Sequence, residues 1–148
     1  MASLAEIGYR NAPELFDARN AASLFSLDAS DNFAQNRISP DKRWIGSVTN
    51  EWEQPSALVI VDASAGQRVK RLPFEKVKLV SLAFNPDVSL VAVGQADGKV
   101  VLVDFETMKI VATFEAHKGP VTSLAFLPDG RSLISAGQDG VVKIWTVP

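Results

Sequence analysis

The sequence predicts an all-β fold made of repeated sheets of short antiparallel strands. The first observation is a repeat: the tetrapeptide Ser-Leu-Ala-Phe at residues 81–84 returns at residues 123–126, 42 positions later, which is the length of one small sheet. The second is that a Pro-Asp pair and then an Asp-Gly pair follow each copy, and both are typical of turns. The third is that the runs between these turns are short and rich in β-branched residues, which favours strands.

The two later copies predict their strands in order. After the tetrapeptide strand, second strands are expected at Ser89–Gly94 and Ser132–Gly137, and third strands at Lys99–Phe105 and Val141–Val147. A fourth strand, Lys109–Glu115, follows in the middle copy. Strand and turn alternate throughout, which predicts sheets whose strands pair with their neighbours along the chain.

An earlier and weaker copy of the repeat starts at Ile38. Its Asp41 lies 46 residues before Asp87, four more than the later period, and a longer loop through residues 50–55 accounts for the difference. Its third and fourth strands are expected at Ala57–Val61 and Gln67–Leu72.

The last copy carries a recognisable motif. Residues 133–145 read Leu-Ile-Ser-Ala-Gly-Gln-Asp-Gly-Val-Val-Lys-Ile-Trp, with Ala116-His117 upstream. In these residues the chain resembles the tryptophan-aspartate (WD) repeat family, and the resemblance covers roughly residues 24–148. It implies three four-stranded antiparallel WD-type propeller blades, at about residues 32–72, 78–115 and 120–148, around a central channel.

The resemblance also implies a structural tetrad in the last repeat. Its members would be His117 before the first strand, Ser135 in the second strand, Asp139 in the turn and Trp145 in the third strand. A hydrogen-bonded relay from Trp145 through Ser135 and His117 to Asp139 would satisfy polar groups that are costly to bury alone. Such a relay would make the blade rigid.

The two earlier repeats depart from this pattern. The middle repeat has Glu75, Val93, Asp97 and Val103 at the four positions, and the first has Ser47 and Val61 at the second and fourth. We expect apolar packing to hold these blades instead.

The charge and composition exclude several classes of function. Fifteen basic and seventeen acidic residues give a formal net charge of -2, which disfavours a nucleic-acid partner. With one histidine and no cysteine, a zinc site lacks ligands, and we expect no metal and no cofactor. The N-terminus lacks a secretory signal and no run is long enough to span a membrane, so we expect a cytoplasmic protein with no membrane partner.

Ser135, His117 and Asp139 are the residue types of a catalytic triad. However, Ser135 is expected in the middle of a strand, facing a tryptophan, and not on the exposed turn that a nucleophile needs. We therefore expect no catalytic residues and no enzyme. A propeller enzyme with a bound cofactor or metal would need a ligand set that the sequence does not show.

The sequence favours a non-enzymatic scaffold for protein-protein interaction, whose partner it does not identify. The alternative is a regulatory or ligand-sensing propeller segment of a larger protein. A possible partner-binding rim is formed by Glu51, Trp52 and Glu53, because exposed tryptophans are favoured at interfaces. Trp52 could instead fold over Pro55 or Trp44 and close its own loop.

The ends of the chain predict how a ring would close. Residues 1–21 are expected to be irregular or short helical, since Gly8 and Pro13 interrupt the helix formers. Residues 22–148 form the propeller segment, in which strand 22–28 takes an outermost position and is donated to a neighbouring blade at Val141–Val147 of another subunit. Left as a monomer, the chain would expose an apolar blade face at each end. It would therefore be half of a ring completed head to tail, with a homodimer favoured and a trimer possible.

Overall fold

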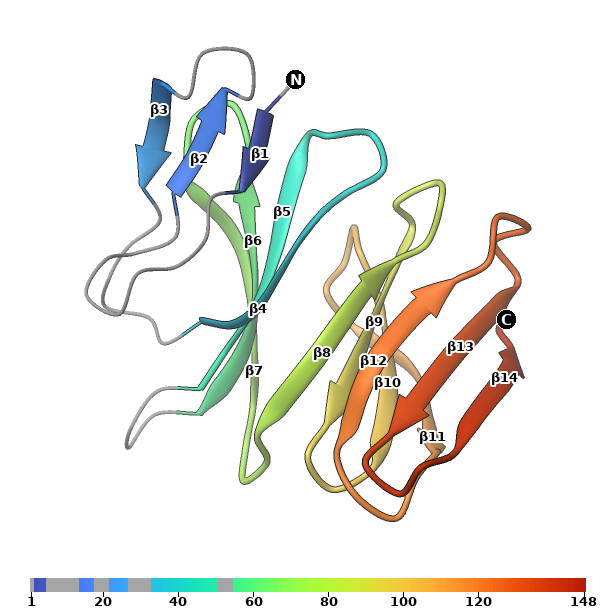
Figure 1. Ribbon diagram of the computed structural model, residues 1–148. Coiled ribbons are helices and arrows are strands. Elements are labelled where there is room, and N and C mark those ends of the chain that lie inside the picture. Colours follow the sequence, from blue (N-terminus) through green and yellow to red (C-terminus); the bar gives the residue numbers. More distant parts are fainter. Residues whose placement is uncertain (1, 5–13, 18–21, 27–32, 51–54) are drawn as a thin grey trace.

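The computed structural model describes residues 2–4, 14–17, 22–26, 33–50 and 55–148. Residues 33–146 form three antiparallel sheets in chain order, which we call the first, second and third blade (Figure 1). The first blade contains β4 (Phe33–Ile38), β5 (Trp44–Thr49), β6 (Ser56–Asp62) and β7 (Arg68–Phe74). The second contains β8 (Leu79–Phe84), β9 (Leu90–Gln95), β10 (Lys99–Asp104) and β11 (Ile110–Glu115). The third contains β12 (Val121–Phe126), β13 (Ser132–Gly137) and β14 (Val142–Thr146).

The first strands of the three blades follow one another through the molecule. β4 contacts β8, and β8 contacts β12, so each blade lies beside the next one along the chain. Within every blade each strand pairs with its neighbours in sequence. Tight turns explain this topology, because short connections leave a strand no other partner.

The N-terminal segment differs from the expectation. Residues 2–4 and 14–17 form strands β1 (Ala2–Leu4) and β2 (Glu14–Asp17), and with β3 (Ala22–Ser26) they make a three-stranded sheet. The prediction of an irregular or short helical segment over residues 1–21 is therefore wrong for the residues described. A helix this short gains little from propensity alone, whereas a three-stranded ladder pairs the backbone groups of its strands.

β3 already has a partner in its own chain. It pairs antiparallel with β2, with Leu15 opposite Phe25 and Asp17 opposite Ala22. Strand 22–28 was expected to be donated to a neighbouring blade; its described part, residues 22–26, is the edge strand of the β1–β3 sheet, so the pairing with β2 uses one of its two edges. The sequence does not indicate the pairing of β3 with β2, because β1 and β2 are too short to carry a period-2 pattern.

Two apolar clusters hold the three blades together. One lies between the first and second blades and includes Val48, Leu58, Leu82 and Val93. The other lies between the second and third blades and includes Leu102, Val121, Leu124 and Leu133. Successive side chains of a strand point to opposite faces of its sheet, and the second blade contributes side chains to both clusters. Both faces of the second blade are therefore buried.

The first blade also has a buried face on its other side. Ile45, Ala57, Val59 and Val61 form a separate cluster and are at most 1% exposed. Figure 1 places the β1–β3 sheet on the side of the first blade away from the second. A monomer was expected to expose an apolar blade face at each end, and the burial of this face corrects that expectation for the first blade.

Candidate functional site

The loop before β12 carries His117, and a glycine in the second blade fixes it. Gly98 lies in the turn between β9 and β10 with a φ of +92°. Its carbonyl oxygen accepts hydrogen bonds from the backbone N–H groups of Ala116 (3.1 Å) and His117 (2.9 Å). A Cβ at residue 98 would lie 1.9 Å from the carbonyl oxygen of His117, so only glycine fits here.

Four side chains of the third blade form a continuous hydrogen-bonded relay. Trp145 Nε1–H donates to Ser135 Oγ at 2.9 Å, and Ser135 Oγ lies 2.8 Å from His117 Nε2. His117 Nδ1 lies 3.1 Å from Asp139 Oδ1. The structure thus joins all four residues of the tetrad.

The order of donors fixes the histidine tautomer that satisfies every group. Ser135 Oγ accepts from Trp145, so its own hydrogen is free to be donated to His117 Nε2. Nδ1 then carries the proton of a neutral ring and donates it to the Asp139 carboxylate. In this arrangement each buried polar atom has a partner.

Asp139 closes the relay at the molecular surface. Its oxygens also accept the backbone N–H groups of Lys118 (3.1 Å) and Val141 (3.1 Å). Burial works to raise the pKa of Asp139, but these two N–H groups and the His117 ring outweigh it and hold that pKa below its usual value. The ionised carboxylate therefore ties the loop of His117 to the turn before β14.

The tetrad leaves no room for a side chain at residue 137. A Cβ on Gly137 would lie 2.5 Å from His117 Cγ and 2.7 Å from Asp139 Oδ1. The glycine of the repeat motif is thus required by close packing, since its φ is not in the left-handed region.

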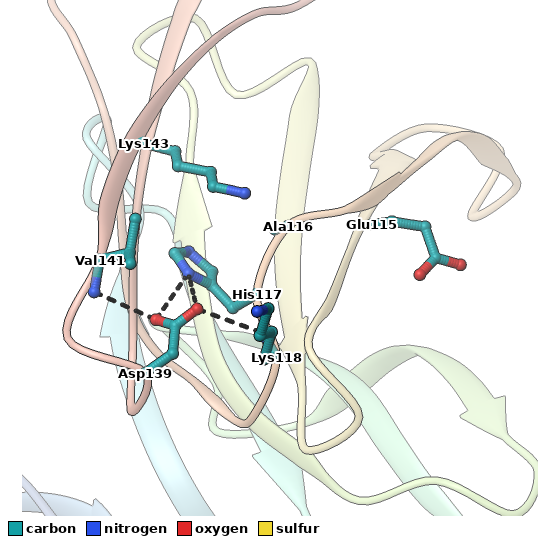
Figure 2. Close-up of a pocket in the computed structure, with 7 residues that line it drawn as sticks. All are labelled: Glu115, Ala116, His117, Lys118, Asp139, Val141 and Lys143. Carbon is teal, nitrogen blue, oxygen red and sulfur yellow. Dashed lines mark hydrogen bonds and ion pairs between the residues drawn. The ribbon is translucent and has the colours of Figure 1, made fainter.

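A pocket of about 420 Å³ opens beside the tetrad. Figure 2 shows its lining, in which Asp139 bonds to His117, Lys118 and Val141. Lys143 lies over the Trp145 ring at 5.7 Å, and Phe114 stacks on that ring at 5.1 Å. The lining residues are Glu115, Ala116, His117, Lys118, Asp139, Val141 and Lys143.

The pocket exposes little of the Ser-His-Asp trio. The His117 side chain is 0% exposed, and Ser135 is 0% exposed. The Asp139 side chain is 14% exposed. Surface groups around the pocket can therefore meet a partner, whereas the serine and the histidine are enclosed.

The equivalent positions of the earlier blades are filled differently. In the second blade Val93 and Val103 are fully buried in the apolar cluster, Glu75 is exposed, and Asp97 accepts the backbone N–H of Lys99. In the first blade Val61 is buried and Ser47 Oγ donates to Asn36 Oδ1 at 2.6 Å. Apolar packing replaces the tetrad in the second blade, as expected.

The rim residues Glu51, Trp52 and Glu53 lie outside the described residues. Asn50, just before them, hydrogen-bonds to the backbone of Leu79 through Nδ2 at 2.7 Å and Oδ1 at 3.1 Å. This side of the loop is therefore fixed to the second blade. Trp44, the other candidate partner of Trp52, packs on Phe105 with ring centroids 5.5 Å apart.

Sequence reasoning missed the serine and threonine partners of a set of aspartates that close the strand-to-strand turns. Asp62 and Asp104, in the place of the family's Trp-Asp aspartate, accept the N–H and hydroxyl of Ser64 and Thr107. Asp87 binds Ser89 in the same way. The signal was present in the spacing, because aspartate with serine or threonine two or three residues later is typical of such turns.

Two further features bear on the class of site. Among the described residues, no three histidine, cysteine, aspartate or glutamate side chains are grouped as metal ligands. The same residues include no helix of the length and hydropathy needed to cross a membrane.

Comparisons with known proteins agree with the repeat. A family model described as "WD domain, G-beta repeat" matches residues 108–146, and one for the anaphase-promoting complex subunit 4 WD40 domain matches residues 55–121. The chain belongs to the WD-repeat β-propeller family. The tetrad described above lies within the segments that these two WD models match.

The curated relatives that match are considerably longer than this chain. The human WD repeat-containing protein 36 is 40% identical over 47% of this chain and 8% of its own length. The Drosophila melanogaster retinoblastoma-binding protein 5 homolog is 44% identical over 46% of this chain and 14% of its own. The Schistosoma mansoni WD repeat-containing protein SL1-17 is 30% identical over 74% and 35%. The chain thus spans 8–35% of these relatives.

Solved structures show the same fold. A chain of the crystal structure of the mitotic checkpoint complex matches 93% of this WD-repeat chain with a TM-score of 0.77 and 22% identity, over 42% of its own length. U3-55K matches 81% of this chain with a TM-score of 0.72 and 19% identity, over 37% of its own length.

Proposed function

We propose that this WD-repeat chain is a non-enzymatic scaffold for protein-protein interaction in the cytoplasm. The observation that carries the proposal is that His117 and Ser135 are both fully enclosed. Their hydrogen bonds are used to join Trp145, the loop before β12 and the turn before β14. A serine and a histidine enclosed in this way would meet no substrate. The surface around the pocket, by contrast, is held rigid by these hydrogen bonds and offers a partner a preformed binding site.

The surface around the pocket combines charged and apolar side chains, as protein interfaces do. Lys118 and Glu115 are exposed at the pocket, beside the apolar Val141 and the half-buried Lys143. Similar proteins named for retinoblastoma binding are consistent with this class of function. We propose that Glu51, Trp52 and Glu53 belong to the same partner-binding rim.

The finer part of the proposal is assembly. We propose that chains associate head to tail to complete a propeller, with a dimer favoured over a trimer. Since β3 lies at the edge of the β1–β3 sheet, the contact would join the β1–β3 end of one chain to the third blade of another. A heterologous contact of this kind closes into a ring when its rotation allows.

Crosslinking in a lysate of the source cell tests the scaffold. A photoreactive group placed at Lys118, beside the pocket, should crosslink to a defined protein, and Trp52→Ala should reduce that product several-fold without changing the unfolding midpoint, since loop substitutions usually stay within about 0.5 kcal/mol. The matched control places the group at Glu106, exposed in the turn between β10 and β11. Identical products from both positions, or no product, would contradict a partner site at the rim.

A further inference from the structure

The face of the third blade that points away from the second blade is exposed and apolar. Val142 and Ile144 of β14 are 66% and 69% exposed. The register places Ile144 beside Ile134, and Ile134 beside Ala125. Val142 lies beside Ala136 in the next row. One sheet face therefore presents two adjacent rows of aliphatic side chains to solvent, which monomeric proteins usually avoid.

The repeat shows what covers this face elsewhere in the molecule. Each of Ala125, Ile134, Val142 and Ile144 stands 42 positions after a residue of the second blade: Ala83, Ala92, Val100 and Leu102 respectively. Those four are at most 7% exposed, and they pack in one cluster with Val121, Leu124 and Leu133 of the third blade. At this face of the second blade the occupant is another blade.

A polar contact recurs at the same register. Gln35 of β4 accepts the backbone N–H of Leu82 through Oε1 at 2.8 Å, and Ser81 of β8 donates from Oγ to the carbonyl of Val121 at 2.7 Å. Both side chains reach from the first strand of one blade to the first strand of the next. Ser123 occupies this position in β12, 42 residues after Ser81, and it is exposed, with no hydrogen bond to its hydroxyl among the described residues.

We infer that the face formed by Ser123, Ala125, Ile134, Ala136, Val142 and Ile144 is a docking surface for a further WD-type blade. The first strand of that blade lies beside β12 and accepts the Ser123 hydroxyl through a backbone carbonyl. This deepens the proposed function and rests on it, because it names the surface that an assembling partner uses.

The side chains of the face also specify the shape of the partner. The position of Ile134 is held by Gly46 in the first blade and Ala92 in the second. A Cβ on Gly46 would lie 2.6 Å from Leu82 and 2.8 Å from Phe84, so large residues of the following blade fill the space there. Because Ile134 fills that space itself, the docking blade must carry residues smaller than leucine and phenylalanine at the facing positions.

A covalently supplied blade tests this inference independently of self-association. A second copy of residues 106–147 is joined after Val147 of the full chain, so that it provides a fourth strand for the third blade and then the first three strands of another blade. Because the added blade carries Leu and Phe at the facing positions, the extension is made with the native Ile134 and with Ile134→Ala.

The expected result is a rise in the thermal unfolding midpoint of the original blades by about 5 °C or more on extension, with a larger rise for Ile134→Ala. Ile144→Lys in the original copy should remove that rise. At a dilution at which the unextended chain is monomeric, the same change should leave the midpoint of that chain unchanged, because the side chain is exposed there. No rise in either background, or an equal effect of Ile144→Lys with and without the extension, would overturn the docking surface. A monomeric unextended chain would contradict only the proposed assembly.

Discussion

At the scale of single residues, the rigidity of the third blade depends on what surrounds His117. The ring is held from both nitrogens, by Ser135 and by Asp139, and therefore has no freedom to move aside. A Cβ on Gly137 would lie within 2.7 Å of the His117 ring and the Asp139 carboxylate, so this residue is sensitive to any added side chain.

Gly137→Ala should destabilise the chain by about 1–3 kcal/mol, the usual effect of forcing extra atoms into a packed site. The matched control is Gly119→Ala in the neighbouring loop, where the nearest atom would be Gln138 Cβ at 3.9 Å, an ordinary contact. That control should stay within about 0.5 kcal/mol. Urea denaturation followed by circular dichroism measures both, and equal effects would show that the tetrad does not restrict residue 137.

Trp145 contributes both a ring and a donor, and two variants separate them. Trp145→Ala removes the ring that stacks on Phe114 as well as the N–H that Ser135 accepts, and it should cost about 3 kcal/mol. Trp145→Phe keeps a six-membered ring beside Phe114 but loses the donor together with the five-membered ring, and it should cost less, about 1–2 kcal/mol. The free energy of unfolding checks the order, and a Phe variant as unstable as the Ala variant would show that the stacked six-membered ring contributes nothing.

The tetrad residues themselves could be predicted from the sequence, because the spacing of His117, Ser135, Asp139 and Trp145 follows the WD pattern. The backbone hydrogen bonds that position the His117 loop could not be predicted. The hydrogen bonds from the loop of His117 to Gly98 cross between blades, and an Asp-Gly pair in the sequence indicates only a local turn. Long-range contacts of the backbone leave no signature in the residue types that make them.

At the scale of elements, the turns depend on ionised aspartates. Donors from Ser64 lower the pKa of Asp62, and donors from Thr107 lower that of Asp104. Donors from Ser89 lower the pKa of Asp87, and those from Arg131 and Ser132 lower that of Asp129. Each carboxylate is therefore more acidic in the folded chain than in the unfolded one.

This predicts that the chain loses stability in acid. A group whose pKa is lowered by folding stabilises the fold fully above its unfolded value, about 3.9 for aspartate, and loses that contribution as the pH falls through the folded value. The unfolding midpoint should thus change little between pH 7 and 5 and decline below about pH 4. Asp104→Asn keeps an acceptor for the Thr107 N–H and should show a shallower decline; a slope identical to that of the parent would contradict a role for Asp104.

The strands show where prediction from sequence succeeds and where it stops. Residues 33–146 could be predicted because turn pairs and the 42-residue repeat separate each strand from the next. The β1–β3 sheet could not, since its strands have three to five residues and their pairing depends on each other more than on local pattern.

At the scale of the whole molecule, the chain has two different ends. The third blade exposes Val142 and Ile144, whereas the outer face of the first blade is buried in the cluster of Ile45, Ala57, Val59 and Val61. The sequence alone predicted two open faces, because it gave no reason to expect a sheet before β3. Head-to-tail assembly therefore has to cover one apolar face and not two.

Native mass spectrometry of the purified chain tests that assembly. A dimer near twice 16.0 kDa is expected. Ile144→Lys should shift the dimer to monomer while leaving the circular dichroism spectrum unchanged, because a charge would be buried at the contact but is solvated in the free chain.

Deleting residues 1–30 removes the opposite end, so the deletion should also abolish the dimer. It should in addition increase binding of a hydrophobic dye if the N-terminal sheet is what covers Ile45 and Val59. A matched Lys76→Glu change, at an exposed position between β7 and β8, should leave the mass at that of a dimer. A full chain that is monomeric at every concentration would rule out head-to-tail assembly, and a dimer that survives both Ile144→Lys and the deletion would place the contact on another surface.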